Sequence, residues 1–272
     1  QDQLIAEALT APFTNPEARS GEARKMALAR LRQLSAHEVG HTLGIDHNFA
    51  ASFSGDASVM DYPHPDLYLD ESGSVRLNRA YRTGVSPWDT LAVRYGYQHF
   101  NRDDEAAGLT SILNEARVQG IAFLGDQDAR APGSAHPGAH LWDNGQNVLA
   151  RLEELIAIRQ TGLENFSPGV LPEGTPLFEM ERRLVPVFLL HRYQIEATAK
   201  LLGGLRYEYA LKGEPTEALV PIDGASQEQA LQALIDLLKP ERLALPSSLR
   251  YLIPPPVLEH SRDREFFPGA TG

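Results

Sequence analysis

The stretch HEVGHTLGIDH, residues 37–47, places histidines and a glutamate at fixed intervals. Apolar residues recur at helical spacing from about residue 17 or 21 to 43, which predicts one long helix through the first part of this stretch. His37 and His41 are four residues apart, so on a helix their imidazoles lie one turn apart on the same face. The two side chains can therefore converge on one point beside the helix.

A glycine and a third histidine follow the helical part. Gly44 stands where a helix end favours a residue in the left-handed conformation, so we expect the chain to turn there. That turn would bring His47 back beside the first two histidines. Zinc accepts imidazole nitrogen, and catalytic zinc sites commonly use three protein ligands and leave a fourth position open. We therefore expect His37, His41 and His47 to bind Zn²⁺.

Glu38 follows the first histidine and cannot share its face of the helix, which suits it to proton transfer instead of metal binding. Because zinc lowers the pKa of a coordinated water to roughly 7, a nearby carboxylate can act as general base at neutral pH. The alternative is that these are ordinary polar residues on a solvated helix. Residue frequencies put a chance match of all the specified positions at on the order of one in ten thousand chains of this length. The metal site is therefore the favoured interpretation.

The whole stretch fits HExxHxxGxxH, the signature of the metzincin metallopeptidases, at every specified position. The resemblance implies a methionine turn beneath the metal, and SVMDYP, residues 58–63, lies where that turn is expected, with Met60 as its apolar base. Tyr62 occupies the place where astacins and serralysins have a tyrosine that can approach the metal or a developing oxyanion. A purely structural tyrosine is the alternative. Asp61 is expected either to orient a ligand imidazole or to shape the turn.

Further stretches resemble the catalytic domain of large bacterial secreted zinc-dependent metalloproteases. They are AHEVGHTLGIDHNFAAS, SVMDYP, WDTLAVRYGY, LWDNGQN, HRYQIEATAKLLGG and SQEQALQALIDLL, between about residues 30 and 250. The resemblance implies a secreted or periplasmic bacterial protein that acts on a protein or peptide substrate. Metzincins build a twisted sheet before the active-site helix, whereas most residues before His37 here read as helix. We therefore expect that sheet to lie outside this chain, in an upstream domain of the same full-length protein.

Composition limits the other function classes. The net charge is −11 and no Lys/Arg-rich block occurs, so the chain has no electrostatic footprint for nucleic acid or for an anionic membrane. The absence of cysteine excludes disulfides, thiolate metal sites and cysteine nucleophiles. The longest apolar run, residues 184–190, is far shorter than the roughly 20 residues of a membrane span. No G-x-S-x-G, P-loop or dinucleotide-binding glycine pattern is found.

The remaining pattern predicts a mainly α fold, α+β in class, with a zincin-like active-site helix, a Met-turn and a small hairpin around Ser72-Gly73. Two parts are predicted: a metzincin active-site region, residues 1–144, and a helical C-terminal subdomain, residues 145–272. Other helices are expected at about 86–96, 103–118, 146–160, 176–202 with a kink or break at Pro186, 226–239 and 246–252, and strands at 121–125 and 205–211. The long loop 125–147 is a candidate rim of the substrate cleft, and the Pro-rich tail from residue 253 reads as loosely docked.

Two weaker metal candidates lie in that loop. His136 and His140 are four residues apart, but the proline and glycine between them argue against a helix. Asp126, Asp128 and Asp143 are calcium-type ligands that lack the twelve-residue loop pattern. Neither candidate approaches the strength of the three-histidine motif.

The favoured function is a zinc metallopeptidase, most simply an endopeptidase, in which Glu38 is the general base. Two alternatives stay open. One is a zinc-containing helical binding or scaffold domain without catalysis of its own, and the other is an enzyme that cleaves a different amide or an ester, because fold does not fix substrate.

Overall fold

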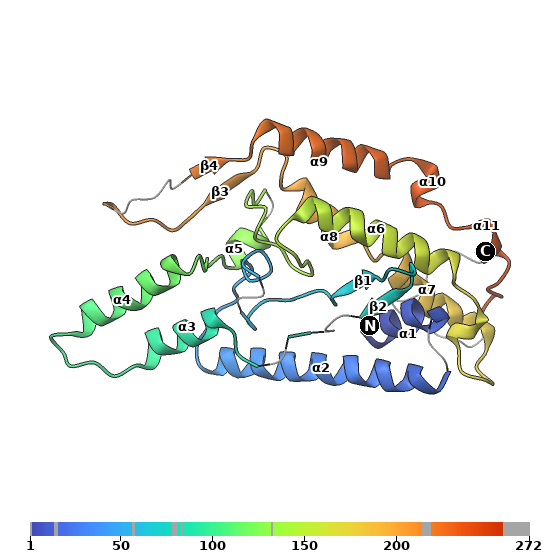
Figure 1. The fold of residues 1–272 in the computed structure, drawn as a ribbon, viewed down its shortest axis with the longest axis horizontal. Helices are drawn as coiled ribbons and strands as arrows, with labels where there is room; N and C mark the ends of the chain where they lie inside the picture. Colours follow the sequence, from blue (N-terminus) through green and yellow to red (C-terminus); the bar gives the residue numbers. More distant parts are fainter. Residues whose placement is uncertain are drawn as a thin grey trace.

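The computed structural model describes residues 2–13, 16–55, 58–77, 81–82, 84–131, 133–213 and 219–257. These residues form a mainly helical fold with two separate two-stranded antiparallel hairpins (Figure 1). The mainly α class is therefore confirmed. The helices are α1 (Asp2–Thr10), α2 (Pro16–Thr42), α3 (Pro87–Tyr97), α4 (Glu105–Val118), α5 (Asp126–Ala129), α6 (Val148–Glu164), α7 (Met180–Phe188), α8 (Arg192–Ala199), α9 (Gly224–Leu237), α10 (Pro240–Leu243) and α11 (Ser247–Arg250). Short 3-10 turns are η1 (Ala11–Phe13), η2 (Pro168–Val170) and η3 (Leu177–Glu179), and the strands are β1 (Leu67–Leu69), β2 (Val75–Leu77), β3 (Leu205–Tyr207) and β4 (Leu219–Pro221).

Helix α2 is the long helix that the apolar period predicts, and it runs along one edge of the molecule (Figure 1). It ends as expected at Gly44, whose φ of +76° is a left-handed conformation that costs glycine little. The N–H of Ile45 donates to the carbonyl of Gly40 at 3.1 Å, which closes the last turn. The chain then reverses and leads into the segment that carries His47.

Most other predicted elements are present, with one correction. The segment 121–125 is not a strand: it runs as irregular backbone against residues 48–49, where the N–H of Phe49 donates to the carbonyl of Leu124 at 2.8 Å. Pro186 lies inside α7, and the interruption expected there comes a few residues later, at residues 189–191 between α7 and α8. The proline removes one helical hydrogen bond, while the N–H of Leu189 still donates to Val185, so the helix continues to Phe188.

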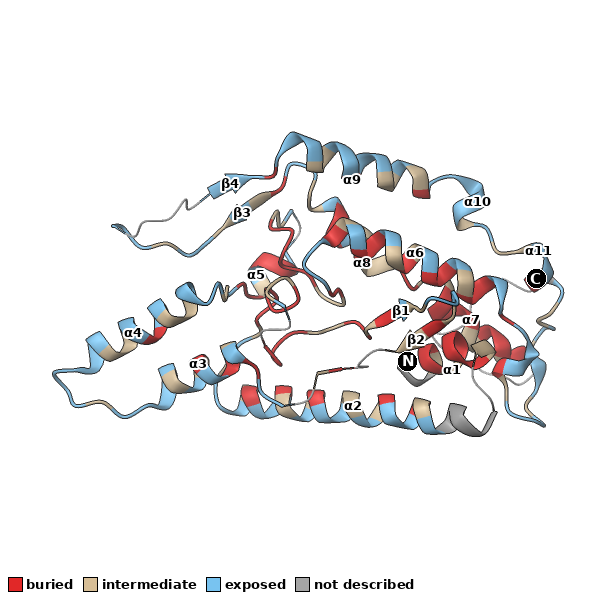
Figure 2. Ribbon diagram, in the orientation of Figure 1, coloured by how far each residue is buried: buried red, intermediate tan, exposed pale blue. Residues whose placement is uncertain are grey.

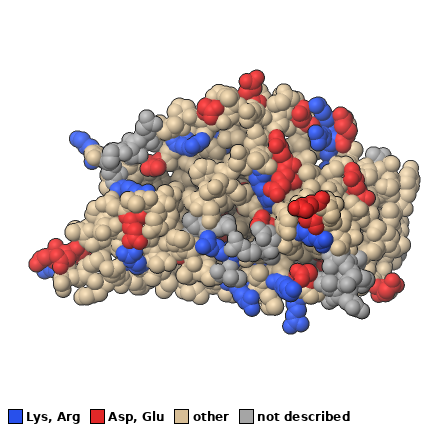
Figure 3. Space-filling view, viewed as in Figure 1, with Lys and Arg blue, Asp and Glu red and all other residues tan. Residues whose placement is uncertain are grey.

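The division at residue 144 stays a prediction. The Pro-rich tail lies outside the described residues from residue 258 onward. Among the described residues, no helix combines the length and the apolar character that a membrane span requires. Figure 3 shows acidic and basic side chains interspersed on the face in view.

The main apolar core lies where α1, α6, α7 and the β1–β2 hairpin meet, the region of densest burial in Figure 2. Leu9, Ile158 and Val187 are fully buried there. Gly162 allows the close approach, because a Cβ at that position would stand 2.6 Å from Leu9 Cδ2. A smaller apolar cluster is built around Phe49, Leu124 and three alanines, and it supports the segment just after His47.

Four buried histidines make the stability of this fold sensitive to acid. Burial lowers the pKa of His64, His136, His140 and His191 from 6.5 to about 4 in each case. The unfolded chain therefore binds more protons than the folded chain below pH 6.5, so stability is complete above that pH and is lost as the pH falls toward 4. Each group contributes on the order of 3 kcal/mol to this loss.

We expect the free energy of unfolding of the metal-free protein to fall steeply between pH 6.5 and 4, as measured by urea titration followed by circular dichroism. Asp143 acts in the opposite direction, because burial raises its pKa to about 7 and its folded form gains stability on protonation. Because protonation of four histidines favours unfolding and protonation of one aspartate opposes it, the net effect of acid is destabilisation. A urea midpoint that stays constant from pH 7 to pH 5 would contradict this account.

Candidate metal centre

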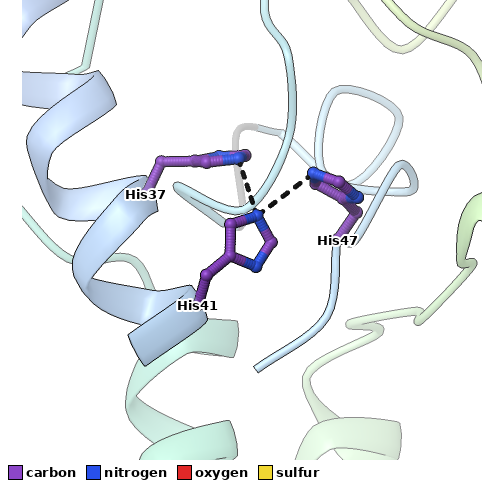
Figure 4. Close-up of side chains that lie close together, drawn as sticks. All are labelled: His37, His41 and His47. Carbon is purple, nitrogen blue, oxygen red and sulfur yellow. Dashed lines mark hydrogen bonds between the residues drawn. The ribbon is translucent and has the colours of Figure 1, made fainter. Parts of the chain in front are cut away.

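The side chains of His37, His41 and His47 converge at the end of α2 (Figure 4). The Nε2 atom of His41 lies 3.1 Å from Nε2 of His37 and 3.2 Å from Nε2 of His47. His37 is fully buried, and the other two are partly exposed. The turn after Gly44 thus brings the third histidine to the first two, as the sequence predicts.

The other ring nitrogen of each histidine is already engaged. Nδ1 of His37 lies 2.9 Å from the carbonyl oxygen of Val59, and Nδ1 of His41 lies 2.9 Å from that of Ile45. Nδ1 of His47 lies 2.7 Å from the Asp126 carboxylate. Since a carbonyl or carboxylate oxygen only accepts, each ring carries its proton on Nδ1 and presents a lone pair at Nε2.

Three lone pairs that face one another repel unless a cation lies between them. Burial lowers the pKa of His37, and the neighbouring rings of His41 and His47 lower it further, although the hydrogen bond with Val59 raises it. Neutral imidazole with its lone pair free is the form that binds a metal. The three residues therefore fit a metal ion, which they can coordinate from one side.

Met60 lies directly against the metal-site helix. Its side chain is 1% exposed, and its sulfur comes so close to Gly40 that a Cβ on that glycine would stand 2.3 Å from it. Gly40 lies between His37 and His41 on α2, so the methionine packs under the site at the place where the helix has no side chain. The N–H of Asn48 donates to the carbonyl of Met60 at 3.1 Å, which ties the turn to the segment after His47.

We expect Gly40→Ala to destabilise the fold by about 1–3 kcal/mol and to weaken metal binding, because the new methyl group must displace Met60 from a packed position. Gly21→Ala is the matched control in the same helix, where a Cβ would meet nothing within 4 Å. That variant should gain about 0.5–1 kcal/mol from the lower entropy of the unfolded chain. Chemical denaturation checks both values, and equal effects of the two variants would contradict the packing role of Met60.

The Met-turn is held from two sides by side chains that the motif does not include. Gln33, one turn before His37, donates from Nε2 to the carbonyls of Val59 at 3.0 Å and Asp61 at 3.3 Å. The carboxylate of Asp89 in α3 accepts from the hydroxyl of Ser58 at 2.6 Å and from the N–H of Val59. The backbone carbonyl that fixes the His37 ring is therefore itself fixed.

Tyr62 reaches the histidine cluster. Its hydroxyl lies 3.1 Å from Nε2 of His47, so it shares the point on which the three nitrogens converge. The ring stacks on Trp142 at a centroid distance of 5.1 Å, and the N–H of Trp142 donates to the carbonyl of Tyr62 at 2.8 Å. Trp142 has a φ of +60°, a sparsely populated conformation for a bulky residue. Strain of this kind tends to occur where a side chain must be held for function.

Glu38 and Asp61, two of the candidates from the sequence, lie in different surroundings: the first is exposed and the second is buried in the Met-turn. Glu38 is exposed on α2 between the first two histidines, where water and a substrate can reach it. Asp61 serves the turn: its carboxylate accepts from the backbone N–H of Ser52 at 3.1 Å and of Tyr62 at 2.6 Å. The carboxylate that contacts a histidine of the cluster is instead that of Asp126.

Asp126 is the residue that the sequence analysis missed as a partner of the histidines. Partial burial alone would raise its pKa, but the hydrogen bonds and charges of His47 and Arg130 together lower it, so the group stays a carboxylate. Nothing in the order of residues shows that a side chain in the loop 125–147 returns to His47. The role of this loop as a rim of the substrate cleft stays a prediction.

Neither of the weaker metal candidates forms a group of three metal-binding side chains among the described residues. The described residues contain one group of three or more metal-binding side chains, and it consists of the histidines at 37, 41 and 47. Asp128 instead accepts from the N–H of Gly125, and Asp143 from the hydroxyl of Ser52. His136 accepts at Nδ1 from the N–H of Gly138, and His140 is buried.

Comparison with known proteins adds one positive finding. A family model described as Met-zincin matches residues 19–266, which is most of the chain. No curated protein and no solved structure matches significantly. The matched region contains the histidine cluster, Met60 and Tyr62 as well as the helices and hairpin that follow.

Proposed function

The chain belongs to the Met-zincin family, and from this membership we propose that it is a zinc metallopeptidase that cleaves internal peptide bonds. The observation that supports this most is the convergence of three imidazole Nε2 atoms whose Nδ1 positions are all occupied. Imidazole nitrogen is a ligand that zinc prefers, and three ligands on one side leave a position open for reaction. The proposed ligands are His37, His41 and His47.

Zinc at this site would polarise the scissile carbonyl and make an attacking water more acidic. In the proposed mechanism, Glu38 accepts the proton of that water and passes it to the leaving amine. Its exposed position beside His37 and His41 suits this task, because the carboxylate is free to follow the proton. The hydroxyl of Tyr62 donates a hydrogen bond to the oxyanion that develops on the substrate.

The proposal extends to location and partners on the basis of the family resemblance. We propose that the protein works in a secreted or periplasmic setting of a bacterium and that its substrate is a protein or peptide. An upstream domain of the same full-length protein would supply the strand edge along which metzincins align an extended substrate.

The test is digestion of a diverse peptide library by zinc-loaded protein, with the products identified by mass spectrometry. New internal ends, lost in the presence of a zinc chelator and restored by added zinc, are the expected result. The control is the same preparation with its zinc removed and not replaced. Binding of zinc without any cleavage of peptides, even when a candidate upstream domain is added, would contradict the proposal.

A second candidate function is a binding domain that uses the metal for structure alone. A cavity of about 430 Å³ borders the Met-turn, with Gln33, Val59 and Asp61 in its wall but none of the three histidines. The buried guanidinium of Arg151 also lines it and leaves Nη2 without a hydrogen-bond partner. The digestion experiment distinguishes the two functions, because only a peptidase produces new peptide ends. An enzyme that cleaves an ester or a non-peptide amide, but no peptide, would have a third class of substrate.

A further inference from the structure

One of the three histidines differs from the others in what holds it. His37 and His41 direct Nδ1 at backbone carbonyls of nearby segments, whereas His47 directs it at the carboxylate of Asp126, 79 residues further along the chain. A carboxylate partner fixes the tautomer and the orientation of a ligand imidazole and makes its free nitrogen more basic. The Asp126–His47 pair is therefore placed to act on metal binding.

The carboxylate is itself held in place. One oxygen of Asp126 contacts His47, and the other accepts a hydrogen bond from Nε of Arg130, the residue that follows α5. The guanidinium of Arg130 lies over the rings of Phe49 and Tyr62, at 5.4 and 5.5 Å from their centroids. An ordinary surface ion pair would leave the carboxylate free to rotate, but here both oxygens have directed partners.

The short helix α5 that carries Asp126 is anchored from the C-terminal half of the chain. Asp128 accepts hydrogen bonds from the hydroxyl of Tyr207, at 2.6 Å, and from that of Tyr209. Lys200, after α8, donates from Nζ to the carbonyls of Ala129 at 3.0 Å and Ala139 at 2.6 Å. Side chains from residues 200–209 thus hold the second half of α5.

We infer that Asp126 is a positioning residue for His47 and that Tyr207, Tyr209 and Lys200 set its place, so that metal affinity depends on residues far from the histidine motif. The inference rests on the proposed function only in taking His47 as a metal ligand. It assigns to the β3–β4 hairpin a role that neither motif implies.

The first test measures zinc affinity by competition with a chromophoric chelator. Asp126→Ala should bind zinc about 10–100-fold more weakly than the parent. Asp126→Asn should lie between the two, because its amide oxygen still accepts from Nδ1 while the negative charge is lost. Asp236→Asn is the matched control: this aspartate also pairs with a cation, Lys239, but on the exposed end of α9. Its zinc affinity should equal that of the parent.

A spectroscopic measurement separates positioning from general loss of structure. Cobalt placed in the parent site should give visible bands whose energy and intensity report the geometry of the three imidazoles, and these bands should change in Asp126→Ala. The unfolding free energy of the metal-free variants should stay close to that of the metal-free parent. If Asp126→Ala binds zinc within twofold of the parent and its cobalt spectrum is unchanged, the inference is wrong.

The second test concerns the anchoring of α5. The double variant Tyr207→Phe with Tyr209→Phe removes both hydroxyls that bind Asp128 but keeps the rings, and it should weaken zinc binding several-fold. Tyr251→Phe is the control, since that ring is 93% exposed. If the double variant binds zinc as tightly as the parent, the two hydroxyls of the hairpin have no role in metal binding.

The results of these experiments distinguish a failure of this inference from a failure of the proposed function. Tight zinc binding by the parent with no peptide cleavage would overturn the function, while the affinities of the Asp126 variants would still decide the positioning role. Equal affinities in parent and variants would overturn the positioning role alone. A parent protein that binds no zinc would overturn both.

Discussion

Glu38→Gln is expected to reduce peptide hydrolysis by about a thousandfold and to leave the zinc content unchanged. Glutamine has nearly the same shape as glutamate but cannot accept and release the proton of the attacking water. Because Glu38 is exposed and is not one of the converging side chains, its loss removes neither a metal ligand nor a core contact. Steady-state kinetics on a peptide that the parent cleaves, together with metal analysis of both proteins, measures this.

Glu22→Gln is the matched control for that experiment. Glu22 lies in the same helix and forms an exposed ion pair with Lys25, so its substitution should change neither turnover nor metal content. The effect of Glu38→Gln should fall on kcat, since the proton transfer belongs to the chemical step. Hydrolysis by Glu38→Gln at the rate of the parent would show that another group is the base.

His41→Ala is expected to lose zinc, peptidase activity and the stability that zinc confers. His41 Nε2 lies between the other two Nε2 atoms, within 3.2 Å of each, so its removal leaves two ligands that face an open gap. Metal that binds the folded state alone stabilises it by about 4 kcal/mol when free zinc is a thousandfold above the dissociation constant. The melting temperature of the parent should therefore fall on chelation, whereas that of the variant should not respond.

His99→Ala provides the comparison, because His99 is exposed after α3 and outside the metal cluster. It should keep the zinc content, the activity and the chelator-dependent shift in melting temperature. Retention of one equivalent of zinc by His41→Ala at parent affinity would mean that the metal is held elsewhere in the chain.

The parts of the site that sequence could predict are those whose spacing is local. Residues 37–47 follow helical spacing to a glycine turn, and the physics of one helix and one turn suffices to bring His47 to His37 and His41. The Met-turn follows so soon that the family pattern places it as well. The helices and the first hairpin were predictable for the same reason, since caps, periods and turn residues are local signals.

The parts that could not be predicted depend on contacts between distant segments. Asp126 looks like any loop aspartate until α5 packs against His47, and the apolar run at 121–125 looks like a strand until its neighbour proves to be irregular backbone. Asp61 had the right position beside the Met-turn for a histidine partner, yet the turn uses its carboxylate for backbone N–H groups. Local pattern shows which side chains have the chemistry, but packing decides which of them meet.

The anchoring of α5 by residues 200–209 also bears on the order of events during synthesis. Its contacts, and the one that α5 makes with His47, span long stretches of chain: His47 and Asp126 are 79 positions apart in the sequence, and Asp128 and Tyr209 are 81 positions apart. Closing such long loops costs entropy and comes late in folding. A ribosome releases the histidine motif well before it releases Tyr209, so a nascent chain passes through a period in which the motif is complete and His47 still lacks its fixed orientation. Under the proposed function, the nascent chain would bind its metal less tightly, and so cleave peptides less, until residues 200–209 have been made.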